Sequence, residues 1–220
     1  MLRNEHPDFH FRGLIVHLKE EAPKLGPDDI AEEIERVRRR LTDRYGDMSR
    51  KELKKVDALR PYIDYFKKYK KTYHLFLQIE SFLHKERGLP FVTPLVSAYF
   101  LSEMETGVLA SAHDLEKIDG EAALVEASGG ETLRLLNGEV RNAPAGDALL
   151  VDRSGVLTCV TQGQDVRSTL SPGSRRAAYY VYGPPGVGDD ELTAAIAKLQ
   201  EHLLSWYGNS IDFEELTPGH

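Results

Sequence analysis

Cysteine is nearly absent from this chain of 220 residues, in which Cys159 is the single one. One cysteine cannot form an internal disulfide, and disulfides belong mainly to proteins of oxidising compartments. The sequence therefore predicts a cytoplasmic protein whose fold is held without covalent cross-links. A position inside a predicted strand favours a small core residue at Cys159 over a nucleophile.

Long apolar runs are also missing. No stretch approaches the roughly 20 consecutive apolar residues that a membrane-spanning helix needs. Residues 1–7 lack the apolar segment of a secretory signal. We therefore expect no membrane partner.

Positively charged residues are fewer than negatively charged ones, and the net charge is -7. Proteins that bind nucleic acid non-specifically are usually basic, so DNA is not an expected partner. Residues 50–71 depart from this balance, with nine Lys or Arg against three acidic residues. Its densest part contains Lys67, Lys68, Lys70 and Lys71. Two interpretations stay open: a solvated helix face, or a patch that contacts RNA phosphates.

The familiar catalytic signatures are absent. The chain has no Cys-x-x-Cys, no His-Glu-x-x-His and no Gly-x-Ser-x-Gly sequence. The glycine-rich segment 183–188 lacks the Gly-Lys-Ser/Thr ending of a phosphate-binding loop. We therefore expect no metal and no cofactor.

Hydrophobic periodicity divides the chain into a helix-rich part, about 26–107, and a strand-rich part, about 108–183. Helices are predicted from about residue 28, from Ser49 with its capping-box partner Glu52, over 62–71, 74–87 and 94–106, and over 192–206. Strands are predicted at 13–18, 122–127, 131–136, 148–152, 156–162 and 177–182. Residues 209–220 show no pattern and are expected to fray.

This order of elements predicts an α+β fold. We expect a mostly antiparallel or mixed β-sheet core, an N-terminal helical region and a C-terminal amphipathic helix. The whole of residues 1–212 is interpreted as a single domain, since a chain of this length suits one large domain or two lobes that share a core.

Two polar segments are candidates for chemistry. In the first, residues 111–117, His113 stands beside Asp114, and a histidine near a carboxylate can act as a general base near neutral pH. The alternative is that Asp114 caps a short helical turn and His113 packs in the core. In the second, residues 162–169, Arg167 could clamp a carboxylate or phosphate, or could pair with Asp165.

The same segments carry a resemblance to a known family. The sequence Thr-Pro-Leu-Val at 93–96 is followed by Gly107 and by Ala-His-Asp-Leu-Glu-Lys-Ile at 112–118. Gly129-Gly130, Asn137-Gly138 and Val151-Asp152 continue the pattern. This ordered set, over about residues 62–182, resembles the B-three/B-four (B3/4) editing domain of the phenylalanyl-tRNA synthetase β subunit.

The resemblance implies a pocket that hydrolyses the ester between a wrongly attached amino acid and the 3′ end of tRNA. The family's pocket histidine falls at Ser111, its helix asparagine at Phe100 and its late glutamate at about Tyr180. Because these positions differ, the family's tyrosine specificity does not transfer to this chain.

Three functions are consistent with the residues and with the resemblance. The first is an aminoacyl-tRNA deacylase acting in trans, whose partners are an aminoacyl-tRNA and its amino-acid moiety. The second is a non-catalytic module that binds tRNA or another RNA. The third is a small-molecule enzyme or amino-acid sensor. For the first we predict catalytic residues His113, Ser111 and Asp114, and a substrate pocket that includes Phe100, Arg167, Thr169 and Tyr180.

Overall fold

A computed structural model describes residues 2–84 and 91–218 of the chain. The helices are α1 (Ala31–Tyr45), α2 (Arg50–Leu53), α3 (Arg60–Lys68), α4 (His74–His84), α5 (Pro94–Thr106) and α6 (Asp189–Tyr207). The strands are β1 (Leu2–Asn4), β2 (His10–Leu18), β3 (Leu109–Asp114), β4 (Ala122–Glu126), β5 (Thr132–Arg134), β6 (Val140–Asn142), β7 (Ala148–Asp152), β8 (Gly155–Cys159), β9 (Gly163–Gln164), β10 (Arg176–Gly183) and β11 (Ile211–Leu216). The predicted α+β class is confirmed.

Local sequence accounts for several helix ends. Ser49 and Glu52 form the predicted capping box at the start of α2. Thr93 caps α5, where its side chain accepts a hydrogen bond from the backbone N–H of Val96. Gly107 ends α5 with a φ of 78°, a left-handed conformation that glycine adopts without strain. The predicted end of α4, at residues 87–88, lies outside the described residues.

The strands form two main sheets and a separate hairpin. One sheet has the order β11-β2-β10-β3 and is antiparallel throughout. The other has the order β1-β4-β7-β8-β9, in which only the pairing of β1 with β4 is parallel. Strands β5 and β6 pair as a hairpin around the predicted turn at Asn137 and Gly138.

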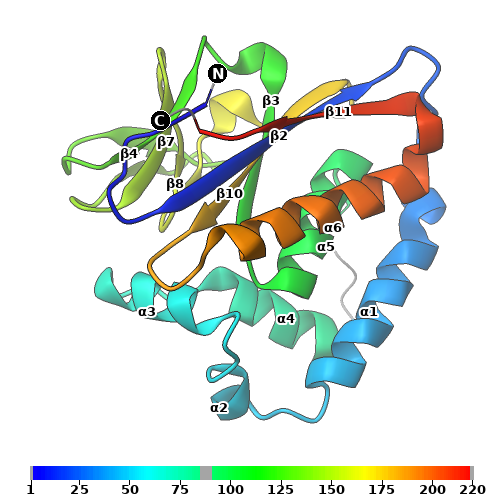
Figure 1. Ribbon diagram of the computed structural model, residues 1–220, viewed down its shortest axis with the longest axis horizontal. Coiled ribbons are helices and arrows are strands. Elements are labelled where there is room, and N and C mark those ends of the chain that lie inside the picture. Colours follow the sequence, from blue (N-terminus) through cyan, green and yellow to red (C-terminus); the bar gives the residue numbers. More distant parts are fainter. Residues whose placement is uncertain (1, 85–90, 219–220) are drawn as a thin grey trace.

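Helices cover one face of the four-stranded sheet, with α5 and α6 lying against it (Figure 1). The five-stranded sheet lies at the opposite side of that sheet in the same view. Side chains of β10 point alternately to the two faces of the four-stranded sheet. The Tyr179 hydroxyl, on the helical face, donates to the carbonyl of Leu95 in α5. The Tyr182 hydroxyl, on the other face, contacts the Ser111 hydroxyl on β3. One hydrophobic cluster runs through both parts of the chain, from Leu2 to Ile211.

Strands β3 and β11 are among those that were not predicted from the sequence. Residues 109–114 form β3, which pairs with β10 so that Ser111 lies opposite Tyr180. The expectation of a frayed tail is wrong for Ile211–Leu216, which form β11 and pair with β2. The residues of β11 that follow Ile211 are exposed or partly exposed, because the strand lies at the edge of the sheet. The strand therefore lacks the alternation of buried and exposed residues that identifies a half-buried strand.

Candidate functional site

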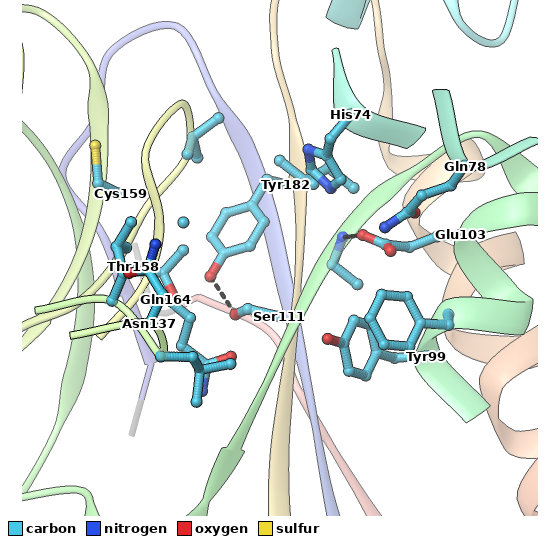
Figure 2. Close-up of a pocket in the computed structure, with 17 residues that line it drawn as sticks. His74, Gln78, Tyr99, Glu103, Ser111, Asn137, Thr158, Cys159, Gln164 and Tyr182 are labelled. Atoms are coloured by element: carbon cyan, nitrogen blue, oxygen red, sulfur yellow. Dashed lines mark hydrogen bonds between the residues drawn. The ribbon is translucent and has the colours of Figure 1, made fainter. Parts of the chain in front are cut away.

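A pocket of about 390 Å³ lies between helices α4 and α5 on one side and β8, β9 and the β5–β6 turn on the other. Strands β3 and β10 cross between these two walls (Figure 2). This volume is in the range of pockets that hold small molecules. The predicted site residues Ser111 and Phe100 both line it.

Ser111 is held by two hydrogen bonds at the centre of the pocket. Its Oγ lies 2.6 Å from the hydroxyl of Tyr182 and 2.9 Å from Nε2 of His113. Ser111 and His113 are two residues apart on β3, so their side chains share one face of the strand. Burial raises the pKa of Tyr182, whose hydroxyl therefore keeps its proton.

His113 lies behind Ser111, fully buried, and does not line the pocket. Its Nδ1 is 2.8 Å from Ser168 Oγ and 3.2 Å from the amide nitrogen of Gln164. The same amide nitrogen donates to the carbonyl of Ala112, which defines it as a donor. Nδ1 therefore accepts, and the imidazole proton is on Nε2, directed at the hydroxyls of Ser111 and Thr158.

This tautomer decides what Ser111 can do. Burial, followed by the nearby charge of Arg167, lowers the pKa of His113 to about 3, so the ring is neutral at pH 7. Since His113 donates to Ser111, it does not remove the hydroxyl proton in this arrangement. Ser111 is consequently an oriented hydroxyl rather than an activated nucleophile.

The helical wall of the pocket carries a second polar group of residues. Glu103 on α5 is 1% exposed, and its Oε1 accepts a hydrogen bond from the backbone N–H of Ala110 at 2.8 Å. Burial raises the pKa of Glu103 to about 8 and lowers that of His74 to about 4. Gln78 lines the same wall (Figure 2). At pH 7 this part of the pocket is therefore largely uncharged.

Arg167 requires a correction. Its guanidinium forms a two-pronged ion pair with Asp152, with nitrogen–oxygen distances of 2.6 and 3.1 Å, and also donates to the carbonyls of Gly155 and Val156. It does not line the pocket. The side chain of Asp165 caps the backbone at Arg167 instead of pairing with the guanidinium. Arg167 is thus bound within the protein and is not available to clamp a substrate.

Three further predicted residues also lie outside the pocket lining. Asp114 caps the short turn 115–117 and accepts a hydrogen bond from the Ser174 hydroxyl at 2.7 Å. The backbone carbonyl of Thr169 accepts from Lys117, and Thr169 forms a β-bridge with His113. Tyr180 is buried against Phe11. The predicted catalytic residue Asp114 and the predicted substrate-pocket residues Thr169 and Tyr180 therefore do not line this pocket, whereas Tyr182, two positions beyond Tyr180 on β10, does.

The basic segment borders the pocket. Lys67, Lys68, Lys70 and Lys71 all have exposed side chains at the end of α3 and in the loop that follows. Lys71 donates to Gln162 at 3.2 Å, directly before the pocket residue Gly163. His74, three residues beyond Lys71, lines the opposite, helical wall. Exposed positive charge therefore lies beside the residues that line the pocket.

Glu103, Gln78 and Tyr182 were not singled out from the sequence. A signal for Glu103 was present, because it lies near the C-terminus of α5, where the helix dipole disfavours a carboxylate. Gln78 and Tyr182 offered no comparable signal, since both fit the ordinary pattern of their helix and strand. Only the packing of α4 and α5 on β3 and β10 brings the three together.

Within residues 2–84 and 91–218, no group of three or more His, Cys, Asp or Glu side chains is arranged to hold a metal ion. None of the helices in these residues is long and apolar enough to cross a membrane. Cys159 lies at the strand wall of the pocket, where burial raises the pKa of its thiol. Its sulfur donates a hydrogen bond to Asp147.

Comparisons with known proteins agree with this fold. The model of the B3/4 domain family matches residues 60–181, more than half of the chain, and the chain belongs to that family. A similar solved structure is an N-terminal fragment of the phenylalanyl-tRNA synthetase β-subunit from Pyrococcus horikoshii, with a TM-score of 0.51 and 11% sequence identity. The predicted family is confirmed, and the synthetase fragment at this identity supports the fold alone.

The match to that fragment covers 99% of this chain and 54% of the other. The chain thus spans about half the length of the fragment. A comparison with curated proteins finds no match.

Proposed function

We propose that this protein is an aminoacyl-tRNA deacylase that acts in trans, hydrolysing the ester between a wrongly attached amino acid and the 3′ end of tRNA. One observation carries the proposal: the oriented hydroxyl of Ser111 lines a pocket of about 390 Å³ in a chain of the B3/4 family. The pocket is large enough to enclose the amino-acid part of such an ester.

In the proposed reaction a water molecule attacks the ester carbonyl. The carbonyl oxygen gains negative charge as the carbon becomes tetrahedral, and the hydroxyl of Ser111 donates a hydrogen bond to it while the Tyr182 hydroxyl donates to Ser111. Collapse breaks the bond to the ribose oxygen, which takes a proton from the attacking water and leaves as the tRNA 3′ end, and the free amino acid is the other product. His113 is a positioning residue in this scheme, because it holds Ser111 without lining the pocket.

The basic segment supports an RNA substrate over a small molecule. Lys70 and Lys71 are exposed beside the pocket, where they can contact phosphates near the tRNA acceptor end. Lysine-to-phosphate contacts add affinity without reading sequence, so the selectivity of the reaction falls to the pocket. Because the net charge of the chain is -7, favourable contact with phosphates depends on local basic segments such as this one.

The test is deacylation of a panel of correctly and wrongly charged tRNAs. We expect selective hydrolysis of one mischarged species by the parent protein. Ser111→Ala should lower kcat by about a hundredfold to a thousandfold, the range for loss of one donor to a developing oxyanion, with a smaller effect on KM.

Ser205→Ala is the matched control, because Ser205 is exposed on α6 and its hydroxyl donates to the carbonyl of His202. This variant should retain full activity. Hydrolysis of none of the charged tRNAs by the parent protein would refute the proposal. Full activity in Ser111→Ala would refute the role assigned to Ser111.

A further inference from the structure

Two buried side-chain oxygens of the pocket have no hydrogen-bond partner within the described part of the chain. They are Oε2 of Glu103 on α5 and Oε1 of Gln78 on α4. Both residues line the pocket on its helical wall (Figure 2). Leaving a buried polar atom unpaired is unfavourable, so these two oxygens in the pocket lining are where a polar group of a ligand would be bound.

The position of Glu103 relative to Ser111 is set by the backbone. Its Oε1 accepts from the N–H of Ala110, the residue directly before Ser111 on β3. The other oxygen of the same carboxyl group is the unpaired one. When the reacting carbonyl of a ligand lies at Ser111, a substituent attached next to that carbonyl therefore lies at Glu103.

The surroundings of Glu103 provide no positive charge. No Lys or Arg of the described residues forms an ion pair with it, although the chain's other buried glutamates, such as Glu33 and Glu105, pair with arginines. Burial holds the titratable groups around Glu103 in their neutral forms, namely His74, Tyr62, Tyr73, Tyr99 and Tyr182. The carboxyl group therefore lacks the counter-charge that would stabilise its ionised form.

We infer that Glu103, with Gln78, binds a positively charged nitrogen of the ligand and so selects substrates that carry an ammonium or guanidinium group there. The inference deepens the proposed function, because it takes the pocket to hold the amino-acid part of the ester. Two sources share this chemistry: the α-ammonium group of any aminoacyl ester, and a basic side chain such as that of lysine or arginine. A hydrogen bond from a positively charged nitrogen of the ligand to the Glu103 carboxylate is stronger than one between neutral groups.

Calorimetric titration with small probes tests the inference without requiring hydrolysis. Leucinamide carries only an α-ammonium, N-acetyl-lysinamide and N-acetyl-argininamide carry only a side-chain cation, and N-acetyl-leucinamide carries none. We expect cationic probes to bind about tenfold or more tightly than the neutral one. Tight binding of leucinamide would identify the α-ammonium group as the source of the cation. Tight binding of N-acetyl-lysinamide or N-acetyl-argininamide would identify a basic side chain.

Binding should also release protons. Glu103 is mainly protonated at pH 7 in the free protein and is ionised in the complex. Titration in buffers of different ionisation enthalpy should therefore show close to one proton released per cationic probe bound. Absence of proton release would contradict the assigned partner.

Glu103→Gln keeps the shape of the side chain and removes its charge, and it should weaken the cationic probes about tenfold with no effect on the neutral one. Gln78→Met is a second variant, expected to weaken the same probes by a smaller factor. Glu116→Gln is the matched control, because Glu116 is exposed outside the pocket.

Two results would overturn the inference: equal affinity of the parent protein for neutral and cationic probes, or unchanged cation binding in Glu103→Gln. Failure of the proposed function is distinguishable, since it would appear as intact cation binding without deacylation of any tRNA. Deacylation without a preference for cationic probes would remove only the inference.

Discussion

At the scale of single residues, Asp147 shows how a buried carboxylate is stabilised without a cation. It is fully buried, and donors surround it: Tyr65 at 2.7 Å, Cys159 at 2.9 Å, and the hydroxyl of Thr161 at 2.5 Å. Asp147→Ala leaves these groups unpaired, and we expect it to lower the free energy of unfolding by about 2 to 4 kcal/mol. Urea unfolding measures this loss.

Asp64→Ala is the control for Asp147, because Asp64 is exposed on α3 and reaches Arg60 only at 3.9 Å. We expect this change to alter stability by less than about 0.5 kcal/mol. A similar effect of the two substitutions would contradict the structural role assigned to Asp147.

Glu103 predicts a pH dependence of stability in the ligand-free protein. Its pKa is raised to about 8 by burial, against 4.5 as the ordinary value. Between these values the folded protein holds a proton that the unfolded chain has released, so the free energy of unfolding falls as pH rises. From pH 6.5 to pH 8 the expected loss is roughly 1.5 kcal/mol.

Urea unfolding at the two pH values checks this loss in the parent protein and in Glu103→Gln, where it should disappear. The comparison of the two proteins isolates Glu103, because His74 and His113, whose pKa values burial lowers, contribute equally to the pH dependence of both. The same pH slope in both proteins would show that Glu103 is ionised in the fold.

At the scale of elements, β11 covers the edge of β2 in the four-stranded sheet. Residues Ile211–Leu216 pair antiparallel with β2, and without them β2 would present unpaired backbone groups. A chain that ends at Asn209 should lose about 2 kcal/mol or more of stability and should aggregate on heating. A chain that ends at Leu216 keeps β11 and should unfold like the parent protein. Thermal unfolding with light scattering compares the two, and equal behaviour would contradict a role for β11 in stability.

At the scale of the whole molecule, the distribution of charge is more informative than its sum. The chain is acidic overall, yet Lys70 and Lys71 are exposed beside the pocket. If they contact tRNA phosphates, affinity should fall with rising salt, and the double change Lys70→Gln and Lys71→Gln should reduce the slope of log affinity against log salt by about 1 to 2. Fluorescence titration at several salt concentrations measures both.

The control for this test removes two positive charges elsewhere, with Lys24→Gln and Arg39→Gln. Both side chains are exposed and neither lines the pocket. This variant should keep the parent's salt slope. An identical slope in all three proteins would reject the basic segment as the RNA contact.

Local sequence alone was enough to predict the α+β class, the capping box at Ser49 and the helix from Pro94 to Gly107, because these depend on neighbouring residues. The family motifs likewise lie in continuous segments. The predictions of Ser111 and Phe100 as pocket residues came from such motifs. Strand β11 could not be predicted in this way, since an exposed edge strand has no hydrophobic pattern of its own.

The remaining parts of the site were decided by tertiary structure. Arg167 was a plausible substrate clamp until folding placed Asp152 within 2.6 Å of it. The protonation of His113 depends on Gln164, a residue 51 positions away, and the raised pKa of Glu103 depends on its burial. Sequence determines which groups can ionise or donate. Their actual charge and direction follow from solvent exclusion and from distant partners, which only the packed chain supplies.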